Sequence, residues 1–267
     1  MRIATWNINS VRIRIPLIKR LVTEARPNIL CLQETKVENK DFPLDALKSL
    51  GFPHIAFSGE KSYNGVAILS KLPLTDIRTM PVVKGSTHKR HISVTLPDGT
   101  ALHNFYVPAG GDIPDRNANP AYGFKLDFVD AMTAWSTTEK RSKQRTIIVG
   151  DFNIAPYEHD VWSSRQLRDV VSHTEPEKTL LLALRASRDW CDAGRHFVPM
   201  EEKLYSWWSY RNRDWKKSNR GRRLDHIWVT PALKPALKHF AVMPDARDWE
   251  SPSDHVPVMI DLSLPAA

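Results

Sequence analysis

The chain has 267 residues, of which 42% are hydrophobic and 25% are charged, as is usual for a globular protein of one large or two small domains. No apolar run approaches the ~20 residues of a membrane-spanning helix, and the first residues have neither the apolar region nor the cleavage site of a signal peptide. The net charge of +8 favours a polyanionic partner, either nucleic acid or an anionic membrane surface.

Eight short apolar runs predict β-strands. They lie at residues 3–8, 29–33, 65–69, 91–96, 102–107, 146–149, 225–229 and 256–262. The second run contains Cys31, which we expect to be a buried free thiol. Since Cys191 is the only other cysteine, the sequence holds neither a disulfide framework nor a zinc site, and it fits a reducing, cytoplasmic environment.

Three segments between these runs predict helices. They are 17–24, which stops before Pro27, 122–135, with apolar residues at three-to-four spacing, and 178–190, which is rich in leucine. Asp98-Gly99 is a hairpin signal between the fourth and fifth runs, so antiparallel pairing is expected. No repeat or flexible linker interrupts the chain, and we expect one domain over residues 1–267. Many strands with few helices predict an α/β sandwich of stacked sheets with helices outside.

Polar residues suited to metal or acid–base chemistry stand at the ends of five apolar runs. Residues two apart on an extended segment share a face, so Asn7 with Asn9, and Asp151 with Asn153, can point into one pocket. Carboxylate and amide oxygens without a Cys/His cluster suit Mg²⁺ rather than zinc. Each piece alone has an ordinary structural explanation, such as a turn or a surface charge, but together they indicate one site. The residues are Asn7, Asn9, Glu34, Asp151, Asn153, Asp225, Asp254 and His255.

Seven motifs run through the chain in a fixed order. They are Trp6-Asn7-Ile8-Asn9, Leu32-Gln33-Glu34-Thr35-Lys36, Asn64-Gly65-Val66-Ala67, Tyr106-Val107-Pro108, Gly150-Asp151-Phe152-Asn153, Arg223-Leu224-Asp225 and Ser253-Asp254-His255. This order resembles the exonuclease III family of abasic-site (AP) endonucleases over essentially the whole chain. The fifth and seventh motifs also occur in the wider endonuclease/exonuclease/phosphatase superfamily, whereas the second narrows the resemblance to the abasic-site branch.

The resemblance implies a four-layer α/β sandwich like that of deoxyribonuclease I. In this fold, two mixed, mostly antiparallel sheets lie face to face with helices outside, and the active site lies at one edge. It also implies hydrolysis of the phosphodiester 5′ to abasic sites, with 3′-to-5′ exonuclease and 3′-end-trimming activity. The expected cofactor is Mg²⁺, with Mn²⁺ as a substitute. The expected partner is double-stranded DNA with abasic sites or blocked 3′ ends, bound by a monomer that needs no membrane.

The resemblance also implies a metal site. Glu34 would be the main metal carboxylate, with Asn7 nearby and Asp254 as a second ligand. Some family members have aspartate where this chain has Asn9. The metal environment here is therefore less negative, which favours a weaker second metal site.

Five further residues would carry the chemistry if the resemblance holds. Asp151 would orient or deprotonate the attacking water, and Asn153 would hold the water or the phosphate. His255 would donate hydrogen bonds to the phosphate, while Asp225 fixes the imidazole and favours its protonated form. Tyr106 would contact the phosphate, and a role in protonating the leaving group stays open.

Basic and aromatic residues between positions 203 and 223 predict contacts with DNA, with eight basic residues against one acidic residue. Trp207 and Trp208 are consecutive, so on a strand one would pack in the core while the other meets DNA. The resemblance places both, with Leu224, near the pocket for the abasic sugar. Some family members have tryptophan where Arg222 stands, so the pocket wall differs here. The remaining residues assigned to DNA are Arg90, as a phosphate-binding position, Arg211 and Arg223.

Two other functions remain open. The first is another phosphodiesterase of the same superfamily, acting on a sphingolipid or an inositol phosphate, against which the Leu-Gln-Glu-Thr-Lys segment argues. The second is a non-catalytic DNA-binding protein on a decayed nuclease scaffold. That alternative predicts loss of Glu34, Asp151 or His255, and all three are present.

Overall fold

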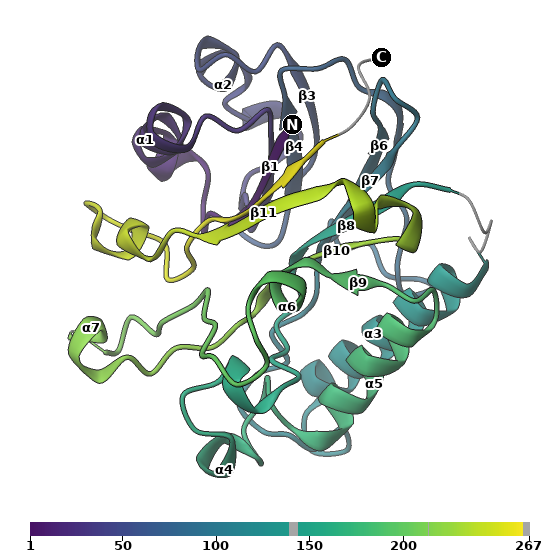
Figure 1. Cartoon of the computed structure of the whole chain (residues 1–267), viewed down its shortest axis with the longest axis vertical. Helices are drawn as coiled ribbons and strands as arrows, with labels where there is room; N and C mark the ends of the chain where they lie inside the picture. The colour runs from purple at the N-terminus through teal and green to yellow at the C-terminus, as the bar shows by residue number, and fades with distance from the viewer. Residues whose placement is uncertain (139–143, 213, 264–267) are drawn as a thin grey trace.

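Two six-stranded sheets lie face to face in the computed structural model, which describes residues 1–138, 144–212 and 214–263 (Figure 1). The first sheet has the order β11-β12-β1-β2-β4-β3 and the second β5-β6-β7-β8-β10-β9. Each contains one parallel pair, β1 with β2 and β7 with β8, and its other pairs are antiparallel. The strands are β1 (Arg2–Asn7), β2 (Ile29–Gln33), β3 (His54–Ser58), β4 (Val66–Ser70), β5 (Thr75–Arg78), β6 (His91–Thr95), β7 (Ala101–Tyr106), β8 (Thr146–Asp151), β9 (Cys191–Asp192), β10 (Asp225–Val229), β11 (Leu237–Val242) and β12 (Val258–Leu262).

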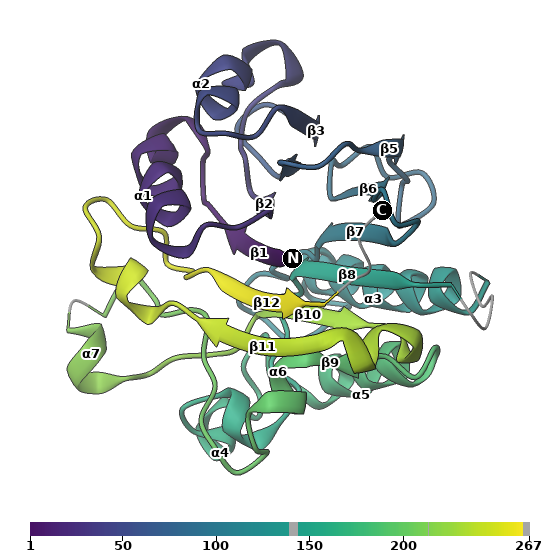
Figure 2. The same ribbon diagram turned by 45° about the horizontal axis from the view of Figure 1, so that its top comes forward.

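Helices cover the outer face of each sheet and complete four layers (Figure 2). Helices α1 and α2 pack on the first sheet, and α3 and α5 run side by side over the second. The α-helices are α1 (Ile15–Ala25), α2 (Leu44–Ser49), α3 (Pro120–Thr138), α4 (Ser164–Leu167), α5 (Glu175–Ala186), α6 (Ala193–Phe197) and α7 (Trp215–Ser218). Short 3₁₀ helices span Arg12–Arg14, Asn39–Asp41, Glu158–Asp160, Pro231–Ala236 and Pro244–Asp248. The predicted four-layer sandwich is confirmed.

The central strands are buried on both faces, which is why they appear in the sequence as continuous apolar runs. Along β2, Ile29 and Cys31 enter the layer between the two sheets, whereas Leu30 and Leu32 face α1 and α2. Cys31 is a free thiol, as predicted, and burial raises its pKa. Within the described residues, no helix combines the length and the apolar character needed to cross a bilayer.

The eight predicted strands are all present, with ends shifted by one or two residues. Strand β12 begins only at Val258 because Pro257 precedes it. Strand β5 was not predicted, because all four of its residues are exposed and it lacks an apolar pattern. Strands β3, β9 and β11 were missed as well. The third predicted helix is misplaced: a capping box at Thr174 and Glu177 starts α5 early, and it ends at Ala186.

Helices α3 and α5 are joined by a fully buried ion pair. Lys125 Nζ lies 2.5 Å from Glu177 Oε1, and both side chains are inaccessible to solvent. The same ammonium donates to the carbonyl oxygens of Ala109 (3.1 Å) and Asn153 (2.8 Å), which belong to two loops at the sheet edge. The pair therefore fixes those loops to the helical layer.

Candidate active site

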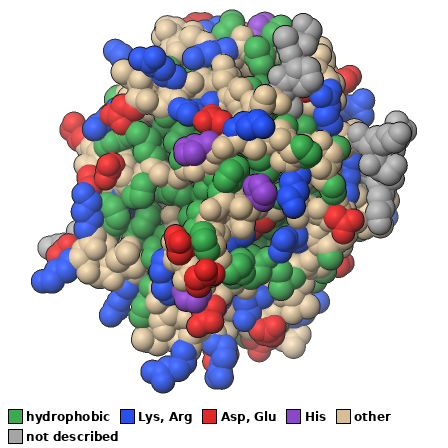
Figure 3. Space-filling model, viewed as in Figure 1, with side chains coloured by type: hydrophobic (Ala, Val, Ile, Leu, Met, Phe, Trp, Pro, Cys, Tyr) green, Lys and Arg blue, Asp and Glu red, His purple; other side chains and the backbone are tan. Residues whose placement is uncertain are grey.

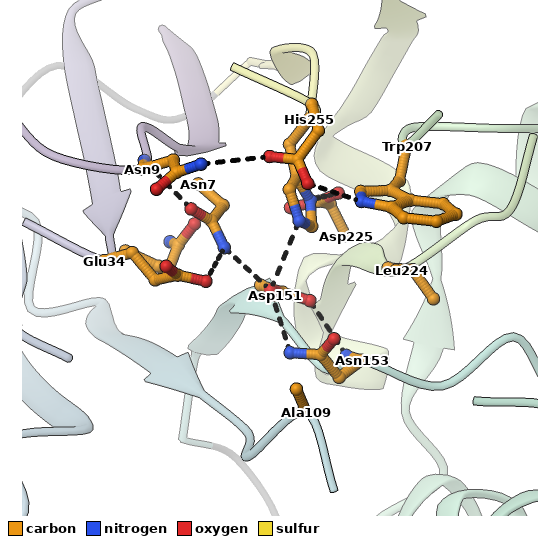
Figure 4. Close-up of polar contacts among 12 residues, drawn as sticks. Asn7, Asn9, Glu34, Ala109, Asp151, Asn153, Trp207, Leu224, Asp225 and His255 are labelled. Atoms are coloured by element: carbon orange, nitrogen blue, oxygen red, sulfur yellow. Dashed lines mark hydrogen bonds and ion pairs between the residues drawn. The ribbon is translucent and has the colours of Figure 1, made fainter. Parts of the chain in front are cut away.

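Strand register brings the polar motif residues to one edge of the sandwich. In the parallel pair β7–β8, Tyr106 stands opposite Asp151, and in the antiparallel pair β8–β10, Asp225 stands opposite the same Asp151. In the other sheet, β1 and β2 are parallel and end together at Asn7 and Gln33, so Glu34 follows at the same edge. The two sheets thus present their catalytic candidates across one gap (Figure 4).

The loop that carries Glu34 has a tightly constrained backbone. Glu34 adopts a left-handed φ of 53°, and its neighbour Thr35 bonds to the carbonyl of Gly65. A Cβ atom on Gly65, which has a φ of +87°, would lie 2.1 Å from Thr35 Oγ1, so only glycine fits there. This contact explains the Asn64-Gly65 motif, which positions the Glu34 loop. Unusual backbone angles held by such packing are typical of functional sites.

Asn7 links the two carboxylates of the site. Its Nδ2 donates to Glu34 Oε1 and to Asp151 Oδ2, each at 2.9 Å. Asn153 holds Asp151 from the other side, with its backbone N–H on Oδ1 (2.9 Å) and its Nδ2 on Oδ2 (3.0 Å). Burial raises the pKa of Asp151; the charge of His255 opposes this, whereas those of Asp225 and Glu34 reinforce it.

His255 is oriented by a buried carboxylate. Its Nδ1 lies 2.8 Å from Asp225 Oδ2, which leaves Nε2 turned towards Asp151 Oδ2 at 3.7 Å. Burial alone would lower the pKa of His255, but the charges of Asp225 and Asp151 outweigh it and raise that pKa to about 10. Ser206 Oγ also donates to Asp225 Oδ2 at 2.6 Å. The imidazolium is therefore the favoured form and can act as a hydrogen-bond donor.

The oxygen donors around Glu34 fit a hard cation. Burial would raise the pKa of Glu34, but the Lys36 ammonium and hydrogen bonds from Asn7, Lys36 and Tyr106 lower it, so the carboxylate is ionised. The Lys36 Nζ lies 2.8 Å from Glu34 Oε2 and 2.6 Å from Asn9 Oδ1, which shows that these oxygens attract a cation. Such donors suit Mg²⁺.

Two other acidic groups are weaker candidates for ligands. Asp254 accepts bonds from Trp207 Nε1 (2.9 Å) and Asn9 Nδ2 (3.4 Å), so it reaches the Glu34 group only through Asn9. Asp151, Asp225 and His255 offer ligand atoms within 4.8 Å of one another. Within this group the Nδ1 of His255 is already paired with Asp225 Oδ2 at 2.8 Å.

Tyr106 and Arg90 stand beside Glu34. The Tyr106 hydroxyl donates to Glu34 Oε1 at 2.6 Å, and its pKa is raised well above the usual value by burial and by the charges of Glu34 and Asp151. The Arg90 guanidinium lies over the Tyr106 ring, 4.5 Å from its centroid. Both residues line a second hollow next to Glu34.

An open cleft of about 820 Å³ adjoins the catalytic candidates. Asn153, His255, Trp207 and Leu224 all line this cleft, and Figure 4 shows how their side chains lie. Five of the seven residues predicted to contact DNA line this cleft or the hollow beside it. Trp207, Arg211, Arg222 and Leu224 line it, whereas Arg90 lines the neighbouring hollow. Arg213, part of the predicted basic stretch, lies outside the described residues.

Two residues assigned to DNA are buried, so Trp208 is the core member of the expected tryptophan pair, and the assignment of Arg223 to DNA conflicts with its burial. Trp208 is 3% exposed and packs between Tyr205 and Trp215 in the core, with its Nε1 bonded to Asn219. Arg223 is 2% exposed and pairs with two buried carboxylates, at 2.9 Å in each case. These carboxylates belong to Asp160 and Asp192. Neither side chain has a surface that DNA could contact.

The two adjacent tryptophans should differ sharply in their effect on stability. We expect Trp208→Ala to lower the free energy of unfolding by roughly 3–5 kcal/mol, because a large buried side chain leaves a cavity. Trp207→Ala should cost clearly less, since Trp207 is only partly buried in the cleft wall. Urea unfolding of both variants followed by circular dichroism measures the difference. Equal losses would contradict the assignment of Trp208 to the core.

Sequence reasoning missed three side chains that shape the site. Lys36 contacts Glu34, Ser206 contacts Asp225, and Ser253 Oγ donates to the carbonyl of Asn7 at 2.7 Å. Lys36 and Ser253 belong to motifs that were recognised, but no role was assigned to them. Ser206 gave no signal, because its partner is 19 residues away in the sequence.

Comparisons with known proteins agree on one family. The model of the endonuclease/exonuclease/phosphatase family matches residues 4–255. An exodeoxyribonuclease III from Haemophilus influenzae is 29% identical, with 97% of this chain and 98% of that protein aligned. A solved AP endonuclease from Archaeoglobus fulgidus is 30% identical, with a TM-score of 0.92 over 99% of this chain and 100% of its own. The 3′ phosphatase NExo from Neisseria, solved with a product DNA hairpin, is 32% identical with a TM-score of 0.91, and the alignment covers 99% and 100% of the two chains.

Proposed function

Because this chain belongs to the endonuclease/exonuclease/phosphatase family, within its exonuclease III branch, we propose that it is a DNA-repair nuclease. The proposed reaction is hydrolysis of the phosphodiester 5′ to an abasic site in duplex DNA, with further action on 3′ ends. The chain would form one catalytic domain over residues 1–267. The observation that carries the proposal is the position of Asp151, held between Asn7 and Asn153 and facing His255.

Phosphodiester hydrolysis needs a base for the attacking water, and Asp151 is placed for it. Its carboxylate is buried and fixed at both oxygens by Asn7 and Asn153, so it can accept a proton without reorienting. The raised pKa makes it a stronger base than an exposed aspartate. Asn153 borders the cleft and would also orient the phosphate or the water.

The opposite side of the site supplies hydrogen-bond donors for the phosphate. His255, kept protonated by Asp225, would donate from Nε2 to a phosphate oxygen as negative charge increases there. Tyr106 and Arg90 would contact the phosphate from the side of Glu34. His255 with Asp225, and Tyr106 with Arg90, are already held in position by contacts within the protein.

A divalent cation fits beside these groups. Glu34 and Asn7 would hold it, and we propose Mg²⁺, for which Mn²⁺ can substitute, because all the donors are oxygen atoms. When bound, the cation would neutralise charge on the phosphate and on the leaving oxygen. Asp254 is proposed as an outer ligand that acts through Asn9.

A single oligonucleotide experiment tests the proposed function. A duplex with one tetrahydrofuran abasic analogue, labelled at the 5′ end, is incubated with the protein and Mg²⁺, and in parallel with excess chelator. We expect the first labelled product to end in a 3′ hydroxyl immediately 5′ to the analogue, with shorter products later if the 3′ end is trimmed, and no product with chelator. Binding without cleavage would identify a non-catalytic DNA-binding protein. Cleavage of a sphingolipid or inositol phosphate with no action on DNA would identify another phosphodiesterase.

Duplex binding should depend steeply on salt. Exposed basic residues lie at the cleft rim and on α7. Lys and Arg side chains are spread over the face of the molecule shown in Figure 3, with acidic side chains among them. Each neutralised duplex phosphate contributes about −0.9 to the slope of log K against log salt. We expect the Arg211→Ala variant to lose roughly one phosphate contact, and the control Lys19→Ala, on α1, to keep the slope. Fluorescence anisotropy in chelator measures both. A slope near zero for the unmodified protein would show that this face does not bind DNA.

A further inference from the structure

Arg222 occupies an unusual electrostatic position in the wall of the cleft. Its Nη1 donates to the carbonyl of Val171 (3.0 Å) and to Ser172 Oγ (2.7 Å), and the guanidinium lies over the Trp207 ring, 5.2 Å from its centroid. These contacts fix the side chain in the wall. None of them neutralises its charge, because every acceptor is an uncharged oxygen or a ring.

No carboxylate among the described residues lies within ion-pair distance of Arg222. Glu177 is the one acid that favours the charged form of Arg222, but Lys125 neutralises it at 2.5 Å. Glu177 also accepts hydrogen bonds from Ser172 and Thr174. Burial lowers the pKa of Arg222, and its Nε has no partner. A partly buried cation without a counter-ion favours an anion that arrives with a ligand.

The location of this cation limits what that anion can be. Arg222 and Leu224 are two residues apart, and both line the cleft that Asn153 and His255 also line. The group attached to a phosphate held by His255 would therefore lie in the same cleft as Arg222. An intact abasic deoxyribose is uncharged, so it would leave the guanidinium without a counter-ion.

We propose that Arg222 makes the cleft select substrates that carry a negative charge on the group attached to the scissile phosphate. This inference rests on the proposed nuclease function. The anion is either the carboxylate of a short fragment left at a damaged 3′ end or the next phosphate of a continuing strand. Both match a guanidinium, which binds carboxylate and phosphate oxygens through paired donors.

Hydrolysis of such a fragment is balanced without any further reactant. Water forms the new bond to phosphorus, and the bond between phosphorus and the 3′ oxygen of the DNA breaks. The water loses its proton to Asp151 and the 3′ oxygen gains one. The products are a 3′ hydroxyl and the free phosphorylated acid, whose carboxylate stays unchanged.

Two pairs of substrates, each differing only in charge, test the proposal. The first pair is a gapped duplex that ends in 3′-phosphoglycolate or in the neutral 3′-phosphoglycolamide. The second is an internal tetrahydrofuran whose 3′-side linkage is a phosphate or a neutral methylphosphonate. We expect the protein to prefer the charged member of at least one pair by about 10-fold or more in kcat/KM, as is usual for charge-assisted hydrogen bonds. The pair that shows the preference identifies the source of the anion.

The Arg222→Gln variant should reduce that preference to within about two-fold, and Arg222→Lys should keep part of it. A ratio taken within one variant cancels any loss common to both substrates, such as partial unfolding. The matched control is Arg220→Gln, an exposed arginine of the same cleft that stacks on Trp162, which should keep the full preference. Affinities for the same pairs in chelator provide a second readout that does not need turnover.

The outcomes separate the two proposals. Failure to cleave any of the four substrates would reject the nuclease function itself. Cleavage with equal efficiency within both pairs would overturn the role of Arg222, as would a preference that Arg222→Gln leaves unchanged. A preference that disappears in both Arg222→Gln and Arg220→Gln would indicate a general basic field rather than a specific contact.

Discussion

Asp151→Asn should lower the single-turnover rate of cleavage by about 10²- to 10⁴-fold, while the affinity for abasic duplex changes only a few-fold. The variant keeps the shape of the side chain but removes the group that accepts the water's proton, and general bases contribute on this scale. The buried position adds to the effect, because N–H groups of Asn7 and Asn153 point at both carboxylate oxygens, so the NH2 of an asparagine would face a donor in either orientation.

The measurement needs rate and binding on the same substrate. Quenched-flow cleavage of the tetrahydrofuran duplex gives the rate, and anisotropy in chelator gives the affinity. Asp169→Asn is the matched control, since that carboxylate is exposed and pairs only with its neighbour Arg168. If the rate and the affinity of Asp151→Asn fell in parallel, Asp151 would be a binding residue and not the base.

The sequence predicted the parts of this fold whose cause is local. Continuous apolar runs located the central strands, since residues such as Ile29 and Leu30 are buried on opposite faces of the same strand. The polar residues that end those runs met at one edge because β1–β2 and β7–β8 are parallel pairs. The consecutive tryptophans also separated as the geometry of an extended segment requires, with Trp208 in the core and Trp207 in the cleft.

The missing parts depend on contacts between distant residues. Arg223 stands in a basic stretch and was assigned to DNA, yet its partners Asp160 and Asp192 lie 63 and 31 residues away in the chain. No local pattern distinguishes a basic residue that pairs internally from one that faces solvent. Likewise, the charge balance that leaves Arg222 without a counter-ion requires Glu177 and Lys125 to pair across α3 and α5.

The second large effect should appear at the His255–Asp225 pair. We expect His255→Ala to lower turnover by about 10²-fold or more, because it removes a donor that acts when charge develops on the phosphate. Asp225→Asn should cost a comparable amount, although the imidazole ring itself is kept. Once the negative charge of Asp225 is lost, the pKa of His255 falls, because burial opposes protonation and Asp225 is the largest of the charges that oppose this effect, so the donating imidazolium is less populated. Steady-state cleavage of the abasic duplex and thermal unfolding, run on both variants, separate loss of function from loss of fold.

A double variant at positions 255 and 225 tests whether Asp225 acts only by positioning His255 or has a role of its own. If Asp225 acts only through His255, then His255→Ala with Asp225→Asn should be no slower than the slower single variant, since the effects of coupled residues do not add. The contacts of Asp225 favour this outcome. Its Oδ2 atom is hydrogen-bonded to His255 and Ser206, whereas its Oδ1 atom is buried without a hydrogen-bond partner, and Asp225 does not line the cleft. Fully multiplicative losses would instead mean that Asp225 also acts on Asp151 directly, through the charge that raises the pKa of that carboxyl group.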